Sequence, residues 1–243
     1  MNLKDLRNNW EYFARHDPLW AILTISGKRR GRWDQGDFFQ TGVKEIEGVM
    51  EYLKRLNHPL AYARALDFGC GVGRLSQALA YYFDEVTGVD IAPTMITLAR
   101  KYNQKNIKCK FFLNESADLK IFEGNTFDFI YSNIVLQHIE PQFSQLYIEE
   151  FVRVLKPGGL LLFQMPSQRI PFRSTRGVAR SILPFCVLSL LEKMFYGAVM
   201  EMHCMEKNKV IRILENSGAK VKDIAKDNSS GINFLAYRYC VTK

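Results

Sequence analysis

Residues 65–80, ALDFGCGVGRLSQALA, carry the strongest indication of chemistry in the chain. Three glycines stand at alternate positions, Gly69, Gly71 and Gly73, and Asp67 precedes them. Glycines between an apolar run and a helical pattern cost stability unless the backbone there must adopt a special conformation or admit a close neighbour. The pattern therefore predicts a strand that turns sharply into a helix, with a ligand lying across the turn at the carboxyl edge of a sheet.

The spacing of these glycines separates two kinds of cofactor. A dinucleotide-binding loop needs G-x-G-x-x-G, which brings a pyrophosphate to the N-terminus of the helix. The frame that begins at Gly69 has Arg74 at its last position, so this fingerprint fails. A nicotinamide-dependent oxidoreductase is therefore kept only as an alternative from another class.

The pattern that is present, D-x-G-x-G-x-G, resembles the first motif of the class I S-adenosylmethionine-dependent methyltransferases. Four later segments resemble further motifs of that superfamily in the same order: VTGVDIAPTMITLA, FFLNESADL, FDFIYSNIVLQHI and EEFVRVLKPGGLLLF. The resemblance covers about residues 60–167 and, more weakly, 205–243. It implies S-adenosyl-L-methionine as the cofactor and no metal ion.

The resemblance assigns three residues to the ribose and methionine parts of this cofactor. Asp90, an acid at the end of the second strand, is expected to accept hydrogen bonds from both ribose hydroxyls, the alternative being a helix cap. Asp67 and the region of the Gly69 carbonyl are expected to face the methionine ammonium, although Asp67 could instead hold the amides of the loop. Asn133 ends the fourth strand beside the methionine part, or else is a turn residue.

The adenine is expected to lie nearer the third strand. Ile91 and Met95 sandwich it, unless both are ordinary core residues. Glu115 and Ser116 are expected to meet its polar edge with one side chain and nearby backbone N–H groups, the alternative being a simple turn. Asp118 competes for the same adenine amine.

Methyl transfer is an in-line displacement in which the protein mainly aligns the two reactants and excludes water. A general base is needed only where the acceptor must lose a proton, as an alcohol does. His138, in LQHIEP just beyond the fourth strand, is the candidate base. The rate of methyl transfer should then rise with pH through an apparent pKa of ~6.5. The alternative is a contact that holds the loop, and His203 is a second, weaker candidate.

The elements that must position these residues alternate between strand and helix from residue 61 onward. This predicts an α/β fold, a Rossmann-like, mostly parallel seven-stranded sheet with helices on both faces. Residues 1–60 are aromatic-rich and helical in pattern, and form a cap or lid segment. The methyltransferase domain is then 61–243, with residues 168–204 as a helical lid insertion before the last strands.

The insertion contains the apolar stretch SILPFCVLSLLEKMFYGAVM. It could cover a hydrophobic acceptor, form a homodimer face, or contact a membrane surface peripherally. Arg173, Arg176 and Arg180 at its start would suit a membrane surface or an anionic acceptor.

The composition of the chain limits the class of protein, its location and its partners. The chain has 243 residues, 47% of them hydrophobic, and a net charge of +8. It has no apolar run of the ~18 residues that a membrane-spanning helix needs, and no signal-peptide stretch, so a cytoplasmic location is expected. Five scattered cysteines suggest neither disulfides nor zinc. The basic charge suits an anionic small substrate or plain solubility, and the chain shows no nucleic-acid-binding signature.

These observations favour an enzyme that methylates a small-molecule acceptor, on a hydroxyl of a natural product, sugar or lipid-like compound. N-methylation of a small molecule is the nearest alternative. A non-catalytic module that only binds the cofactor is a further alternative from another class.

Overall fold

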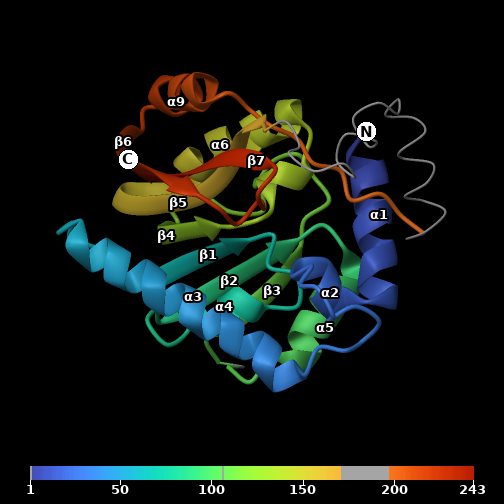
Figure 1. Ribbon diagram of the computed structural model, residues 1–243. Coiled ribbons are helices and arrows are strands. Elements are labelled where there is room, and N and C mark those ends of the chain that lie inside the picture. Colours follow the sequence, from blue (N-terminus) through green and yellow to red (C-terminus); the bar gives the residue numbers. More distant parts are fainter. Residues whose placement is uncertain (1, 106, 171–196) are drawn as a thin grey trace.

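One mixed sheet of seven strands organises the computed structural model, which describes residues 2–105, 107–170 and 197–243 (Figure 1). The strands are β1 Arg64–Phe68, β2 Glu85–Asp90, β3 Cys109–Leu113, β4 Phe127–Ser132, β5 Leu155–Arg169, β6 Lys220–Asp227 and β7 Phe234–Thr242. Their order is β3-β2-β1-β4-β5-β7-β6, and only β7 runs antiparallel to its neighbours. The predicted Rossmann-like, mostly parallel sheet is confirmed.

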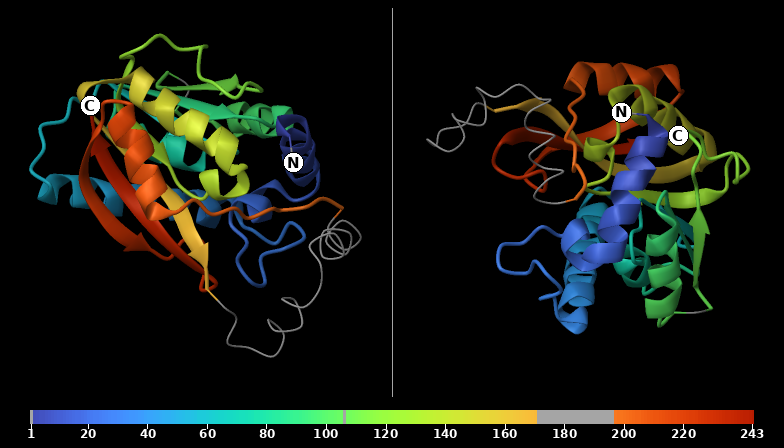
Figure 2. Two further views of the ribbon diagram at one scale, coloured as in Figure 1. Left: turned by 90° about the horizontal axis from the view of Figure 1, so that it is seen from above. Right: turned by 90° about the vertical axis from the view of Figure 1, so that its right-hand side faces the viewer.

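Helices cover both faces of this sheet, as the alternating pattern predicted. On one face lie α3 Gln35–Arg55, α4 Arg74–Leu79 and α5 Pro93–Tyr102, and on the other α6 Pro141–Val154 and α9 Lys207–Asn216 (Figures 1 and 2). Successive strand residues point to opposite faces, so β5 contributes Leu160 and Leu162 to the first core and Leu161 and Phe163 to the second. Burial on both faces explains why these strands read as nearly continuous apolar runs.

The N-terminal helices α1 Leu3–His16 and α2 Pro18–Ile22 lie at the end of the sheet toward which the parallel strands point (Figure 1). Asn2 and Asp5 form a capping box that starts α1. From α1, the Glu11 carboxylate accepts hydrogen bonds from the backbone N–H and hydroxyl of Thr94, at 2.9 and 2.6 Å. Because Thr94 is in the first turn of α5, this contact satisfies a free helix donor and fixes α1 over the sheet edge.

The PGG of residues 157–159 lies inside the fifth strand, because β5 begins at Leu155 directly after α6. The expected helical insertion at 168–204 falls mostly outside the described residues, as do Arg173, Arg176 and Arg180. Of its described parts, the residues up to Arg169 belong to β5, and residues 197–204 contain no helix.

Within the described ranges, no helix combines the length and the apolar character required to cross a membrane.

Candidate functional site

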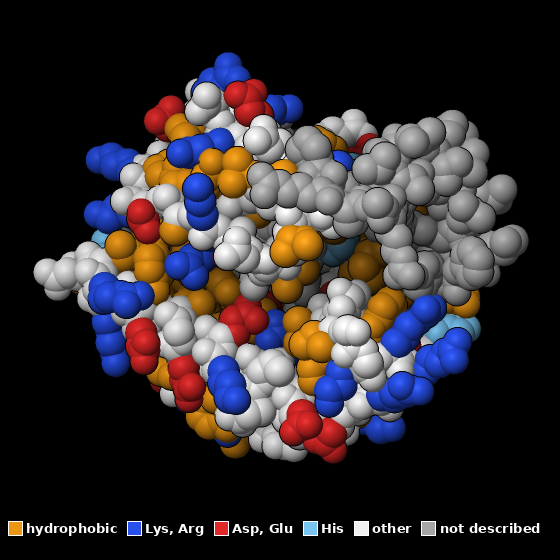
Figure 3. Space-filling model, in the orientation of Figure 1, with side chains coloured by type: hydrophobic (Ala, Val, Ile, Leu, Met, Phe, Trp, Pro, Cys, Tyr) orange, Lys and Arg blue, Asp and Glu red, His pale blue; other side chains and the backbone are white. Residues whose placement is uncertain are grey.

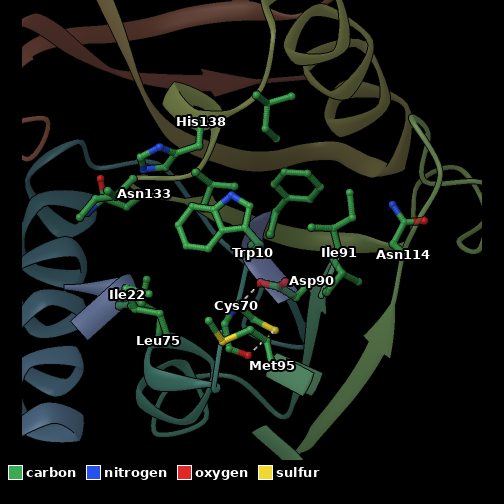
Figure 4. Close-up of a pocket in the computed structure, with 18 of the residues that line it drawn as sticks. Trp10, Ile22, Cys70, Leu75, Asp90, Ile91, Met95, Asn114, Asn133 and His138 are labelled. Carbon is green, nitrogen blue, oxygen red and sulfur yellow. Dashed lines mark hydrogen bonds between the residues drawn. The ribbon is translucent and has the colours of Figure 1, made fainter. Parts of the chain in front are cut away.

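A cavity opens at the carboxyl ends of β1, β2 and β4, where the sequence motifs meet (Figure 4). Its unfilled space, counted to the open mouth, is about 920 Å³. In the space-filling view of Figure 3, the surface is hollowed near the centre. The wall of the cavity contains seven residues that were predicted from the sequence: Gly69, Gly71, Asp90, Ile91, Met95, Asn133 and His138.

The glycine loop after β1 forms the floor of this cavity. Gly69, Gly71 and Gly73 have φ angles of 74°, 51° and 84°, the left-handed region that other residues adopt at a cost. A Cβ atom on Gly71 would lie 2.5 Å from Ile22 Cδ1, so a side chain there would require Ile22 to shift. Gly73 differs from the prediction because it precedes α4 and packs against Phe111, away from the cavity wall.

Asp90 combines support of the loop with the capacity to bind a ligand. Its Oδ2 accepts from the Gly71 backbone N–H and its Oδ1 from the Ala92 N–H, each at 2.9 Å. A carboxylate has about four lone-pair positions, so two remain, which suits the two vicinal hydroxyls of a ribose. Burial raises the pKa of Asp90 to about 6, while the backbone hydrogen bonds oppose that rise. The group is therefore an ionised acceptor at neutral pH.

Asp67 lies below the loop and does not line the cavity. Its Oδ2 accepts a hydrogen bond from the Ser76 hydroxyl at 2.6 Å, and the side chain is buried. Burial raises the pKa of Asp67 to about 7. This position fits the alternative role, in which Asp67 joins β1 to α4 beneath the loop, while its expected contact with a methionine ammonium stays a prediction.

The adenine side of the cavity also differs from the prediction. Ile91 and Met95 line it, but Glu115 and Ser116 do not. Glu115 forms a surface ion pair with Arg7 at 2.6 Å, and the Ser116 carbonyl accepts from the Tyr147 hydroxyl at 2.6 Å. Asn114, one residue earlier, lines the cavity instead. Its amide nitrogen donates to the carbonyls of Ser116 and Asp118, which leaves its side-chain oxygen as the acceptor available to a ligand.

Asn133 is held at the cavity by a carboxylate from α3. Its amide donates to Glu45 Oε1 at 2.8 Å, and the same oxygen accepts from the Tyr131 hydroxyl at 2.9 Å. The other oxygen, Oε2, pairs with the buried Arg74 guanidinium at 2.8 Å. Arg74, which breaks the dinucleotide fingerprint, thus connects the glycine loop to α3.

His138 ends η1, a short helix over Leu136–His138, and its ring is buried in the cavity wall. Its Nδ1 lies 2.7 Å from the Glu201 carbonyl oxygen, which can only accept, so Nδ1 carries the proton. The unprotonated Nε2 faces the Gln137 amide nitrogen at 3.1 Å. Burial lowers the pKa of His138 to about 4, so the ring is neutral at physiological pH. The second candidate, His203, pairs with Glu201 at 3.1 Å and does not line the cavity.

Several wall residues come from the N-terminal segment, which the sequence predicted to be a cap or lid. Leu6 and Trp10 of α1 and Ala21 and Ile22 of α2 close the cavity over the glycine loop (Figure 4). The Trp10 ring meets the His138 ring edge to face, with centroids 5.1 Å apart. The amphipathic spacing of α1 marks Leu6 as a buried position, but no local signal says that it packs on a ligand cavity.

Comparison with known proteins agrees with this geometry. The family model described as a methyltransferase domain matches residues 66–163. The ubiquinone biosynthesis O-methyltransferase of Xanthomonas oryzae pv. oryzae (strain PXO99A) is 32% identical over 133 residues, which cover 54% of each protein. Its namesake from Xylella fastidiosa (strain 9a5c) is 36% identical over 144 residues, covering 55% of this chain and 58% of that one. The chain thus matches about half the length of these curated relatives.

Solved structures share the fold over most of the chain. The magnesium protoporphyrin IX methyltransferase of Synechocystis PCC 6803, solved with bound SAH, has a TM-score of 0.64 at 17% identity and covers 99% of both chains. The PH0226 protein of Pyrococcus horikoshii OT3 has a TM-score of 0.59 at 22% identity, over 92% of this chain and 97% of that one. These likenesses show a Rossmann-like fold of the same kind. Within that fold, residues 66–163 match the model described as a methyltransferase domain.

Asp90→Ala is expected to weaken binding of S-adenosylhomocysteine (SAH), the demethylated cofactor, at least tenfold. The substitution removes hydrogen bonds to a charged acceptor, which contribute ~1.5–3 kcal/mol each, and releases the Gly71 amide. In the wild type, affinity should be full above pH 7 and fall as the pH drops below about 6, because protonation removes an acceptor. Titration calorimetry at pH 7.5 and 5.0 measures both effects.

The matched control for this variant is Asp84→Ala, which removes an exposed carboxylate in the turn before β2. This control should bind SAH like the wild type. An unchanged dissociation constant in a folded Asp90→Ala protein would exclude the ribose contact.

Proposed function

We propose that the protein transfers the methyl group of S-adenosylmethionine to a hydroxyl oxygen of a small-molecule acceptor. The observation that carries this proposal is one continuous cavity wall, which joins the glycine loop and Asp90 to Asn133 and His138. The O-methyltransferase names of the relatives support oxygen as the acceptor atom.

The residues of the cavity fit this cofactor. Asp90 offers two free lone-pair positions to the ribose, Asn114 offers an amide oxygen to the adenine amine, and Ile91 and Met95 supply apolar contact to the adenine ring. Bound there, the cofactor would supply a methyl group on a positively charged sulfur, which is a good leaving group. The apolar residues of α1 and α2 then exclude water from the reacting atoms.

His138 is placed to take the hydroxyl proton as the carbon–oxygen bond forms. The hydrogen bond from Nδ1–H to the Glu201 carbonyl fixes the tautomer in which Nε2 has a free lone pair. The Gln137 amide occupies that lone pair, so it must turn aside when an acceptor binds. Because the imidazole is neutral above about pH 4, it needs no further deprotonation at neutral pH.

Two measurements test this function. Calorimetry with SAH and with NADH should show binding of SAH alone, because the cavity lacks a complete dinucleotide fingerprint. A small-molecule extract incubated with methyl-labelled S-adenosylmethionine should yield a labelled product. A methyl ether survives both mild acid and mild alkali, whereas an ester does not survive alkali. Label found only on nitrogen would contradict hydroxyl methylation, and binding of NADH in place of SAH would contradict the whole assignment.

A further inference from the structure

A group of polar side chains lies on the α3 side of β4, β5 and β7, beside the cavity. Leu162 of β5 and Cys240 of β7 belong to the core beneath α3. Gln164 and Arg238 are each two residues further along and therefore face the same side. The two are direct cross-strand partners. Since Ser132 pairs with Phe163, the cavity residue Asn133 lies in the same row at the carboxyl edge of the parallel strands.

Arg238 is an unpaired cation in this group. Its guanidinium lies over the Tyr52 ring, 4.5 Å from the centroid. Its Nε is buried without a hydrogen-bond partner, and among the described residues the side chain forms neither a hydrogen bond nor an ion pair. The residue as a whole is partly exposed, and its planar guanidinium is suited to pair with an anionic partner such as a carboxylate or phosphate.

The nearby carboxylates do not supply that partner. Glu45 is occupied by Tyr131, Asn133 and Arg74. Asp223 accepts a hydrogen bond from the Tyr52 hydroxyl at 2.7 Å and forms no ion pair with Arg238. Arg238 is therefore left without an ion-pair partner among the described residues.

Gln164 adds an unpaired acceptor beside this cation. The side chain is 1% exposed, and its amide nitrogen donates to the Ser230 hydroxyl, but its Oε1 is buried without a partner. Ser230 in turn donates to Gln137 Oε1 at 2.9 Å, and Gln137 contacts His138. Hydrogen bonds thus connect the Gln164 side chain, through Ser230 and Gln137, to the His138 ring in the cavity wall.

We propose that Arg238 and Gln164 form the subsite that binds an anionic group of the methyl acceptor, so that the substrate is a hydroxyl compound carrying a carboxylate or phosphate. Arg238 pairs with the anionic oxygens, and Gln164 Oε1 accepts a hydrogen bond from a second hydroxyl of the same molecule. The exposed connection 228–231, which brings Ser229 to Asn133 and Ser230 to Gln164, covers the subsite and moves aside as the acceptor enters. This inference rests on the proposed methyltransferase function.

The test uses the full chain, a small-molecule extract and methyl-labelled S-adenosylmethionine. The labelled product should be retained by an anion-exchange resin, because the methyl group goes to a hydroxyl and the anionic group survives. Arg238→Met should raise the KM for the purified acceptor at least tenfold, and Arg238→Lys should recover part of that loss. SAH affinity and the thermal midpoint should stay at wild-type values in both variants. Arg212→Met, which removes an exposed arginine of α9, is the matched control and should have a wild-type KM.

The outcomes separate the inference from the function on which it rests. A labelled product that passes through the resin, or an unchanged KM in folded Arg238→Met, overturns the anionic subsite and leaves the methyltransferase function intact. The absence of any labelled product, with SAH bound normally, overturns the proposed function and the subsite with it. A rise in KM with Arg212→Met as large as with Arg238→Met would show a general effect of net charge and would also overturn the subsite.

Discussion

Replacing Gly71 by valine is expected to abolish measurable SAH binding while the protein remains folded. The residue has φ at 51°, where a β-branched side chain is strained by roughly 1–2 kcal/mol or more. Its Cβ would also meet Ile22 Cδ1 at 2.5 Å, so the Ile22 side chain would have to move within the cavity wall. The strained loop would also disturb the Gly71–Asp90 hydrogen bond, which orients the carboxylate that we propose binds the ribose. We expect a loss of at least ~100-fold in affinity, equal to ~2.7 kcal/mol, measured by calorimetry.

The matched control is Gly48→Val, because Gly48 is an exposed residue of α3 with no atom near its added Cβ. Gly48→Val should bind SAH normally and show an unchanged circular dichroism spectrum. SAH affinity within threefold of wild type in Gly71→Val would disprove the role of this glycine at the cofactor. Global unfolding of Gly71→Val, but not of Gly48→Val, would contradict the prediction by making the glycine essential to the fold.

His138→Ala is expected to lower turnover on a hydroxyl acceptor by ~100-fold or more, the usual contribution of a positioned general base. The pH dependence follows from the burial of the ring, which lowers its pKa to about 4. If His138 is the base, its neutral form is the active one. The titration of His138 should therefore leave turnover unchanged from about pH 5 upward. This revises the expectation of a rise near pH 6.5 that the sequence alone suggested.

A second variant separates proton transfer from simple support. In His138→Asn, the amide nitrogen occupies the place of Nδ1 and can still donate to the Glu201 carbonyl, but the side chain cannot accept the proton. Both variants should lose turnover and retain SAH affinity if His138 is the base. Near-wild-type turnover in His138→Asn, together with low turnover in His138→Ala, would make the histidine a support for the segment around Glu201.

The sequence was most informative where local pattern and tertiary position coincide. The glycines after β1 and the acid after β2 lie at strand ends, and parallel strands bring those ends to one edge, so Gly69, Gly71 and Asp90 could be placed at one cavity. The central strands β1, β4 and β5 were recognisable because burial on both faces makes them nearly continuously apolar.

The predicted and observed cavity walls differ where the sequence left a choice between adjacent residues or between two roles of one residue. The turn after β3 contains Asn114, Glu115 and Ser116 in succession, and which of them enters the cavity depends on the register of the turn and on Arg7, over a hundred positions earlier in the chain. Asp67 was ambiguous for a similar reason, since its partner Ser76 becomes visible only when α4 packs against β1. The contribution of α1 and α2 to the wall is purely tertiary, because nothing local links Trp10 to His138.

The place of β7 in the sheet has a consequence for how the chain is assembled. This strand is synthesised after all the others, yet it lies between β5 and β6. Until it leaves the ribosome, the outer edge of β5 stays unpaired and β6 has no strand to join. Exposed edges of this kind recruit other chains, so the nascent protein passes through a stage open to aggregation. The closing step also joins residues far apart in sequence, such as Leu160 with Thr242, which makes it a slow event in folding.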